Sequence, residues 1–436
     1  MIGMRSFLVL CLACVVLSGL STVALAGLAM SEHEAVNPNP QPNNMHGCSV
    51  ALDGDYVAVG SSYQLDDVNP GTVEVYLSNS YGLLTHQQTL TGYSGSEDFG
   101  VDVSLSGDTL VVGANKASKA YVYTRSGSTW SHQQTLSGTA GRDFGVSVSV
   151  SGDNLLVGQF RDGKAYAYHR DAGTWSLEST IDKPNRFGYG VGISGDVAIG
   201  GTYNDPTNGT LSGSVNIFRR TDTGGGTYAW LDDSPTIYAS DAAANAWFGH
   251  RTDVYADSTL GDVAIVSAKF DDEMAHDAGA AYIFRYDIGT QTWSEQVKLV
   301  AGDYAADDQF GTDVAIFGNT AIVGARYDDD NGSSSGSAYI FQWDGVTYDG
   351  LGKEVWLQVD KLTASDGATI EQFGDGVAVF EDMFGVGAPG YSSGGASNII
   401  GSAYVFAPVP EPSSMVLLAL AMFALLGYRL RLRRRL

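Results

Sequence analysis

The dipeptide Phe-Gly recurs along most of the chain and constrains the fold more than any other feature. Six copies are intact, and His46-Gly47 stands where a seventh copy would begin. Successive copies lie 43 to 63 residues apart, a spacing typical of the structural repeats of propellers and solenoids. We expect each phenylalanine to pack between neighbouring repeats and each glycine to permit a turn. The intact copies are Phe99, Gly100, Phe144, Gly145, Phe187, Gly188, Phe248, Gly249, Phe310, Gly311, Phe373 and Gly374.

Every repeat has the same internal order, which predicts four short strands. In the second repeat an alternating run (101–105) is followed by a Ser-Gly-Asp turn (106–108) and an apolar run (110–113). An aromatic strand (120–123) and a strand containing Trp130 complete it. Alternation with period two and glycine turns are typical of antiparallel hairpins. We therefore predict an all-β fold over residues 45–407, a seven-bladed propeller of four-stranded antiparallel blades.

These units resemble FG-GAP repeats, which are best known from the integrin α-chain propeller and from bacterial surface proteins. The segments GARYDDDNG (324–332) and GSAYIF (336–341) are closest to the bacterial form. The resemblance implies calcium as a cofactor, held in loops of the form Asp-x-Asp-x-Asp-Gly. A short Ser-Gly-Asp turn replaces that loop here, so we expect the integrin-type calcium site to be absent.

The seventh repeat ends after its aromatic strand (403–406) and has no fourth strand of its own. Propellers often close by lending an N-terminal strand to the last blade. Pro38, Pro40 and Pro42 make residues 31–45 a poor strand. We therefore expect an incomplete last blade, or closure by a short piece near Glu34–Asn37, within a polar linker over residues 27–44.

The N-terminus has the features of a secretory signal peptide over residues 1–26. Arg5 precedes an apolar run (7–20), and Ala-Leu-Ala (24–26) forms a small-x-small cleavage site. A retained membrane anchor is the alternative. Removal of this helical segment would leave Cys48 as the single cysteine, which excludes an internal disulfide.

The C-terminus has three parts in a fixed order. A motif (408–414) contains Val409, Pro410, Glu411 and Pro412; an apolar transmembrane helix and an arginine-rich tail follow over residues 415–436. This tail resembles the PEP-CTERM sorting signals of Gram-negative bacteria. The resemblance implies an exosortase-type processing enzyme as a partner, transient holding in the inner membrane, and release to the cell surface in a bacterium that produces exopolysaccharide. A plain tail anchor is the alternative.

The region between these ends is strongly acidic. All 49 acidic residues lie between Glu32 and Glu411, whereas six of the 24 basic residues lie in the terminal segments, so the central region has a net charge of −31. Such a surface repels phosphate backbones, which excludes nucleic acid as a partner.

Acidic residues cluster in loops before the aromatic strands, at Asp66-Asp67, at Asp271-Asp272 and at Asp328-Asp329-Asp330. Asp271, Asp272, Asp328, Asp329 and Asp330 are the candidate calcium ligands, with turn formation and solvation as the more common alternative. Asp241, Asp303 and Asp366 each lie seven residues before a repeat phenylalanine, and their recurrence indicates a structural role.

Aromatic side chains in loops are candidates for stacking on sugars. Trp247, Trp343 and Tyr391 could stack in this way, with Trp343 the better exposed candidate and burial beside Phe248 the alternative for Trp247.

The chain contains no serine nucleophile elbow, no metal-type histidine pair and no phosphate loop. We therefore expect a non-enzymatic surface protein that acts in adhesion or matrix interaction and presents one propeller face to a glycan or protein ligand. Two alternatives stay open: an extracellular polysaccharide hydrolase that uses loop carboxylates, and a calcium-stabilised structural scaffold.

Overall fold

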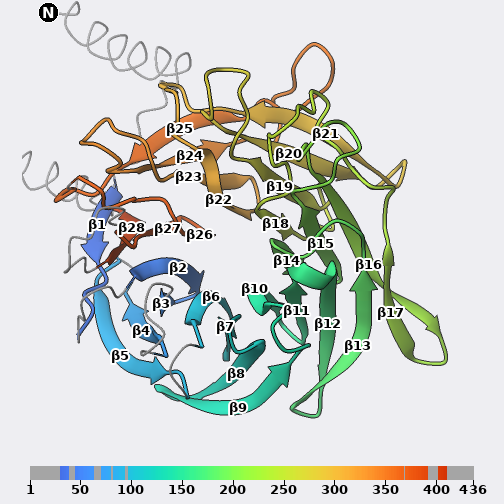
Figure 1. Ribbon diagram of the computed structural model, residues 1–436, viewed down its shortest axis with the longest axis vertical. Coiled ribbons are helices and arrows are strands. Elements are labelled where there is room, and N and C mark those ends of the chain that lie inside the picture. Colours follow the sequence, from blue (N-terminus) through green and yellow to red (C-terminus); the bar gives the residue numbers. More distant parts are fainter. Residues whose placement is uncertain are drawn as a thin grey trace, which may run out of the picture.

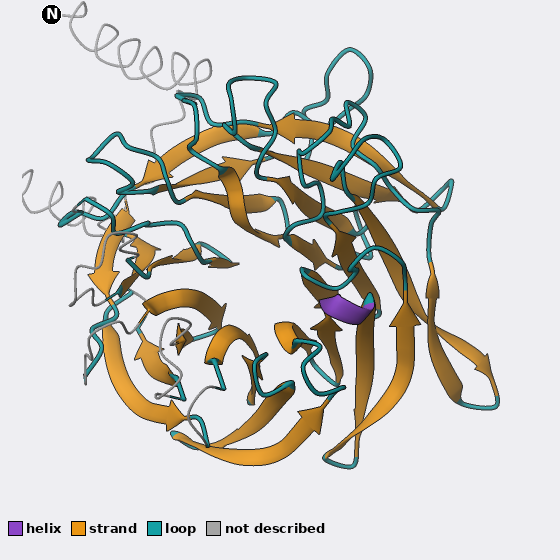
Figure 2. Cartoon of the chain, viewed as in Figure 1, coloured by secondary structure: helices purple, strands orange, loops and turns teal. Residues whose placement is uncertain are grey.

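The computed structural model is a closed ring of seven four-stranded antiparallel sheets (Figure 1). It describes residues 30–38, 45–62, 70–79, 82–93, 97–367, 369–390 and 401–409. Figure 2 shows that these residues are almost all strand and loop, with one short 3-10 helix, η1 (Phe160–Asp162), beside the centre of the ring. The predicted seven-bladed propeller is confirmed.

Each blade is a meander whose strands follow in chain order. Blade 1 has β2 (Met45–Asp53), β3 (Tyr56–Ser62), β4 (Thr72–Ser78) and β5 (Leu84–Thr91). Blade 2 has β6 (Phe99–Ser106), β7 (Thr109–Ala114), β8 (Lys119–Ser126) and β9 (Thr129–Ser137). Blade 3 has β10 (Phe144–Ser151), β11 (Asn154–Gln159), β12 (Lys164–Asp171) and β13 (Thr174–Asp182). Blade 4 has β14 (Val191–Ser194), β15 (Val197–Thr202), β16 (Ser214–Gly224) and β17 (Thr227–Asp232).

The remaining blades follow the same plan. Blade 5 has β18 (Thr252–Tyr255), β19 (Val263–Ala268), β20 (Ala280–Asp287) and β21 (Thr292–Leu299). Blade 6 has β22 (Phe310–Phe317), β23 (Thr320–Ala325), β24 (Ser337–Gln342) and β25 (Leu357–Leu362). Blade 7 has β26 (Val377–Phe380), β27 (Met383–Ala388), β28 (Ser402–Pro408) and β1 (Met30–Glu34). The first strand of every blade contacts the first strands of both neighbouring blades, which closes the ring (Figure 1).

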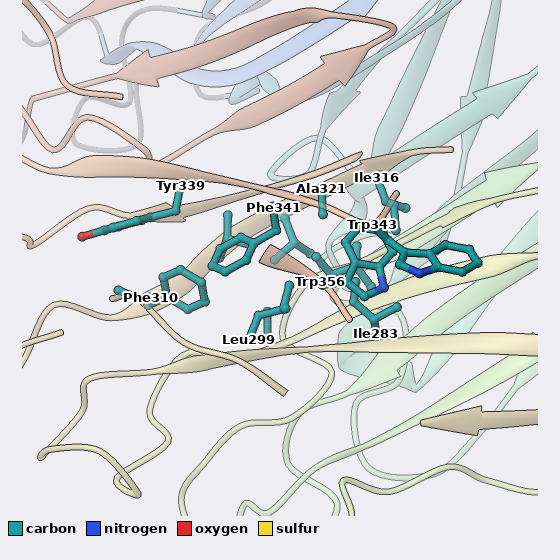
Figure 3. Close-up of a cluster of buried hydrophobic side chains, with 14 of the residues drawn as sticks. Ile283, Leu299, Phe310, Ile316, Ala321, Tyr339, Phe341, Trp343 and Trp356 are labelled. Carbon is teal, nitrogen blue, oxygen red and sulfur yellow. The ribbon is translucent and has the colours of Figure 1, made fainter. Parts of the chain in front are cut away.

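The repeat phenylalanines lie between adjacent blades, as the sequence predicts. Phe310 packs in a cluster formed by blades 5 and 6, with Ile283 and Leu299 on one side and Phe341 and Trp343 on the other (Figure 3). All six repeat phenylalanines are fully buried. Burial between sheets supplies the apolar contact that a single blade lacks.

The glycine after each phenylalanine is required for two reasons. Gly311 has a φ of +91°, which L-residues with a side chain rarely adopt. A Cβ atom on Gly311 would also lie 2.6 Å from the carbonyl oxygen of Ala280 in the preceding blade. The phenylalanine therefore fills the space between two blades, and the glycine lets the backbones of these blades approach closely.

The expectation of an incomplete last blade is wrong, because an N-terminal strand completes it. β1 pairs antiparallel with β28, from Met30 opposite Pro408 to Glu34 opposite Tyr404. This strand lies before the proline-containing segment rather than within it, so the prolines do not interrupt its hydrogen bonds. Closure therefore overlaps the piece expected near Glu34–Asn37 only at Glu34, and part of the expected linker (27–44) belongs to the propeller.

Among the described residues, no helix is long and apolar enough to cross a membrane. The expected signal helix (1–26) and transmembrane helix (415–436) lie outside the described residues.

Candidate functional site

The start of each blade and the end of its second strand lie on the same face of the disc. In blade 6, for example, Phe310 at the start of β22 pairs with Ala325 at the end of β23. We call this the Phe-Gly face. A cavity of about 670 Å³ opens on this face at the centre of the ring, and we call it the central mouth.

Equivalent positions of all seven repeats line the central mouth. The residue that follows each Phe-Gly, or His46-Gly47, contributes to its wall. These seven residues are Cys48, Val101, Val146, Tyr189, His250, Thr312 and Asp375. The repeat geometry therefore places one side chain per blade at the mouth, and the side chains differ in chemistry.

The channel beneath the mouth is lined by the first strands and carries several carboxylates. Asp102 accepts a hydrogen bond from the backbone N–H of Val148 at 2.7 Å, and Asp313 accepts one from Val377 at 2.9 Å. Each bond joins the first strands of two adjacent blades. Burial raises the pKa of Asp313 to about 7. These carboxylates therefore connect blades, which explains their presence without a catalytic role.

Arg251 is the basic residue among these channel carboxylates. Its Nε lies 3.8 Å from Asp313 Oδ1, too long for a hydrogen bond, and its guanidinium lies 5.2 Å from the ring centroid of Tyr189. The Nε atom is buried without a hydrogen-bond partner among the described residues. Arg251 thus faces the mouth with donor capacity to spare.

Lys269 follows β19 and enters the mouth from blade 5. Its residue exposure is 6%, and its Nζ lies 5.4 Å from the ring centroid of Trp247 and 5.0 Å from that of Phe270. Burial, together with the positive charges of Arg326 and Arg251, lowers the pKa of Lys269 to about 7. Within the described residues, no acceptor or carboxylate is paired with its ammonium group.

The carboxylates at the mouth are already paired. Asp375 binds Arg326 at 2.9 Å, and Asp98 lies 3.3 Å from Lys116. Asp143 pairs with Arg161. The mouth therefore has an excess of cationic groups within a domain whose net charge is strongly negative.

Aromatic rings form a row from the mouth outward over blades 3, 4 and 5. The ring centroids of Phe160 and Tyr189 lie 5.2 Å apart, and those of Tyr203 and Trp247 lie 4.8 Å apart. The rings of Tyr189 and Tyr203 are 5.3 Å apart and join the two pairs, and His250 lies 4.9 Å from Tyr189. Phe160, Tyr189 and Trp247 are partly exposed, so their rings offer apolar surface to a ligand in the mouth.

The two tryptophan candidates differ in outcome, and the expected exposure of Trp343 is wrong. Trp343 is 4% exposed and lies in the core between blades 5 and 6, where its Nε1 donates to the carbonyl oxygen of Thr347 (Figure 3). Trp247 is partly exposed on the Phe-Gly face, because a φ of +58° turns it away from the core that holds Phe248. Tyr391 lies outside the described residues.

The acidic loops surround lysine side chains. Lys361 Nζ lies 2.8 Å from Asp303, 2.9 Å from Asp328 and 2.6 Å from Asp330. The hydroxyl of Tyr339 donates to Asp303 at 2.9 Å and also to Asp328. The ammonium group occupies the point at which the carboxylates converge.

Blade 5 repeats this arrangement. Lys298 Nζ lies 2.7 Å from Asp241, 2.9 Å from Asp271 and 2.6 Å from Glu273, and the Tyr282 hydroxyl donates to Asp241 at 2.8 Å. These residues do not fit a calcium ion unless it displaces the lysine.

Asp366, the third of the aspartates that lie seven residues before a repeat phenylalanine, accepts a hydrogen bond from the Tyr404 hydroxyl at 2.9 Å. The structural role predicted for Asp241, Asp303 and Asp366 is therefore to receive the tyrosine of the third strand.

The other predicted calcium ligands lie apart from these lysine-centred clusters. Asp329 is exposed. One ligand atom each from Asp272, His276 and Asp277 lies within 4.8 Å of the other two, on the surface of blade 5. Asp272 also accepts the backbone N–H of Asp277 at 2.7 Å, which is turn formation. Asp66 and Asp67 lie outside the described residues, and the calcium assignment stays a prediction.

Comparison with known proteins agrees with the repeat geometry. The FG-GAP repeat matches residues 85–129, 232–284, 293–341 and 356–406, and the PEP-CTERM protein-sorting motif matches residues 408–435. The chain carries FG-GAP repeats and a PEP-CTERM sorting motif. The sorting motif implies recognition by an exosortase and an exported, membrane-anchored precursor that is processed to the cell surface.

Solved structures resemble this FG-GAP propeller in fold alone. The WD40 domain of coronin from Toxoplasma gondii is 11% identical, with a TM-score of 0.52 and 88% of each chain covered. A chain of a mitotic checkpoint complex is 14% identical, with a TM-score of 0.50, and the match covers 90% of this chain and 97% of the other. A search of curated proteins finds no match.

The sorting motif begins at the edge of the FG-GAP propeller. Val409 directly follows β28 and is 47% exposed, while Pro410, Glu411 and Pro412 lie outside the described residues. A processing enzyme can therefore reach the start of the motif without opening a blade.

The central mouth is the site that sequence reasoning missed. Its signal was present, because Tyr189, His250 and Asp375 occupy the same position after each Phe-Gly. Aligning the repeats on that dipeptide identifies one face of the channel, although it does not reveal which cations remain unpaired.

Proposed function

We propose that this protein is a non-enzymatic binding module of the cell surface, which attaches to extracellular polysaccharide through the central mouth of its FG-GAP propeller. The observation that carries the proposal is the convergence on one cavity of partly exposed aromatic rings and of two cations, Lys269 and Arg251, whose nitrogen atoms have no hydrogen-bond acceptor among the described residues. Tyr189 offers a ring for stacking on a sugar, and Arg251 and Lys269 offer donors to its polar groups. Sorting to the surface would present this site to the extracellular matrix.

A hydrolytic function has less support from the geometry. Two carboxylates that flank a scissile bond must be free to exchange protons or to attack carbon. Asp102, Asp253 and Asp313 in the channel each accept a backbone N–H from the next blade instead.

The test uses residues 27–409, which contain every strand of the ring. We expect this protein to bind the exopolysaccharide of the producing bacterium and to release no sugar products. The variant Tyr189→Ala should weaken binding about tenfold through loss of the stacking surface. Tyr348→Ala is the matched control, because Tyr348 is 52% exposed in the β24–β25 loop on the opposite face.

Soluble sugar products in this assay would establish a hydrolase and overturn the proposal. Equal weakening by both tyrosine variants would place the binding surface elsewhere on the disc.

A further inference from the structure

Lys269 is an unusual residue for the interior of a protein surface cavity. Lysine is almost never buried without a partner, because desolvation of an ammonium group costs several kcal/mol. Here the aromatic faces of Trp247 and Phe270 are its nearest favourable contacts. A neutral or apolar residue would stabilise this position better, so the lysine indicates a function.

The groups around Lys269 make the burial of its ammonium group more unfavourable. Arg251 and Arg326 lie close enough to lower its pKa through their positive charges, and His250 is buried and neutral. Each of the two arginines has a buried Nε without a hydrogen-bond partner among the described residues, as does Nδ1 of His250. Asp375 is the nearest opposing charge, and it is bound to Arg326. The Nε atoms of both arginines and the ammonium group of Lys269 therefore lack an acceptor among the described residues.

We propose that the central mouth recognises a negatively charged group on a sugar ring, bound by Lys269 and Arg251 while the ring packs against Tyr189. This inference rests on the proposed function and specifies the class of polysaccharide. An anion would supply the missing acceptor and offset the charge repulsion between the cations. A cavity of about 670 Å³ accommodates a sugar residue as well as its charged substituent.

The strongly acidic surface outside the mouth narrows the class of anion. A net charge of −31 over the central region repels long polyanions with dense phosphates, such as nucleic acids. A charged polysaccharide can place the sugar at one chain end in the mouth, so that the rest of the chain does not have to cross the acidic surface. A carboxylate and a sulfate share this chemistry, and the polymers compared below distinguish them.

The first experiment compares polymers. We expect residues 27–409 to bind polygalacturonate at least about tenfold more tightly than neutral dextran, since hydrogen bonds to charged groups are strong. Dextran sulfate distinguishes sulfate from carboxylate. The variant Lys269→Met should lose this preference, whereas Lys353→Met on the opposite face should retain it.

The stability of Lys269→Met serves as a control for correct folding. Methionine has a similar length and carries no charge, so Lys269→Met should melt at the same temperature as the unmodified protein or higher. Loss of polygalacturonate binding with unchanged or increased stability supports an anion site. Unchanged binding in Lys269→Met overturns it.

A second experiment separates this inference from the proposed function. Thermal melting with galacturonate, galactose or sodium chloride at matched ionic strength tests the mouth with small molecules. Suppose that no polymer binds and that galacturonate alone raises the melting temperature, with the effect lost in Lys269→Met. This result would support the anion site and contradict the polysaccharide function. Equal binding of dextran and polygalacturonate would support the polysaccharide function and contradict the anion site.

The pH dependence provides an independent readout. The groups that face Lys269 are Arg251, Arg326, His250 and Asp375, and the lysine has a pKa of about 7. Because the anion needs the protonated form, affinity should fall about tenfold between pH 6 and pH 8. Asp313 beside Arg251 also has a pKa of about 7, so Lys269→Met should flatten this slope without abolishing it. An unchanged slope in the variant would assign the titration to another group and contradict the role of Lys269.

Discussion

Nε2 of His46 lies 3.0 Å from the carbonyl oxygen of Ala35, and this bond joins the first repeat to the segment that closes the ring. Since a carbonyl only accepts, Nε2 carries the proton and Nδ1 accepts from the Ser61 hydroxyl at 2.8 Å. The Tyr76 hydroxyl also donates to the carbonyl of Val36 at 2.9 Å. The first repeat thus carries histidine in place of phenylalanine at the position where the N-terminal segment enters between blades 7 and 1.

Restoring the repeat consensus at this position should destabilise the protein. His46→Phe removes two buried hydrogen bonds and leaves Ser61 and the Ala35 carbonyl unpaired, which we expect to cost about 1–3 kcal/mol. Equilibrium denaturation measures this change in unfolding free energy. His132→Phe, on an exposed strand position, is the control and should have little effect. An increase in stability for His46→Phe would contradict the proposed role of the bond.

His46 should also make the fold sensitive to acid. Burial lowers the pKa of His46 to about 4, so the unfolded chain binds a proton before the folded one does as the pH falls. The stability present above pH 6.5 is therefore lost progressively down to about pH 4, by up to about 3 kcal/mol.

Asp313 has the opposite effect on how the unfolding free energy depends on pH. Burial raises its pKa to about 7, so it destabilises the fold as the pH rises toward neutrality. The difference in unfolding free energy between the unmodified protein and His46→Phe isolates the histidine. A difference that does not vary between pH 4 and pH 7 would refute this assignment.

Truncation of a repeat phenylalanine should open a cavity between two blades. Phe310 is fully buried, with its ring 5.5 Å from that of Tyr339 and 5.9 Å from that of Phe341. Phe310→Ala should cost about 3–5 kcal/mol in thermal or chemical denaturation. Tyr348→Ala should stay within about 0.5 kcal/mol of the unmodified protein.

Two glycines with positive φ allow the cost of backbone strain to be measured separately from the cost of close packing. Gly318, in the β22–β23 turn, has a φ of +59° and open space around its Cα, so Gly318→Ala should cost about 1 kcal/mol. Gly311→Ala adds a contact with the backbone of the preceding blade and should cost about 3 kcal/mol or more. Similar melting temperatures for the two variants would argue against a close approach at Gly311.

Removal of Lys361 should expose the repulsion among the carboxylates that it bridges. Asp303, Asp328 and Asp330 would then share a partly buried site, and Lys361→Met should cost about 3 kcal/mol. Millimolar calcium should raise the melting temperature of this variant more than that of the unmodified protein. An equal calcium shift in both proteins would mean that the ion binds elsewhere, with the surface group at Asp272 as the next candidate.

The sequence predicts the fold well where a signal repeats in every blade. The position of Phe310 and the turn at Gly318 follow from local patterns that seven copies reinforce. The strand Met30–Glu34 could not be recognised in the same way, because its sequence lacks clear alternation and its partner in β28 lies at the other end of the chain.

The candidate site was harder to predict for a different reason. The role proposed for Lys269 and Arg251 depends on hydrogen-bond acceptors that are missing among the described residues, and this emerges only when the blades are assembled. Lys361 illustrates the converse, since a loop rich in aspartate suggests metal binding until the opposing lysine is in place.

Closure of blade 7 by strands from both chain ends also bears on how such a protein can evolve. Internal duplication can add a repeat while leaving β1 beside β28, whereas a repeat appended at either end would separate them. The PEP-CTERM sorting motif also begins at the end of β28 in this blade. Variation in blade number should therefore arise in the middle of the gene, and lineages of such proteins should share their first and last repeats more faithfully than the others.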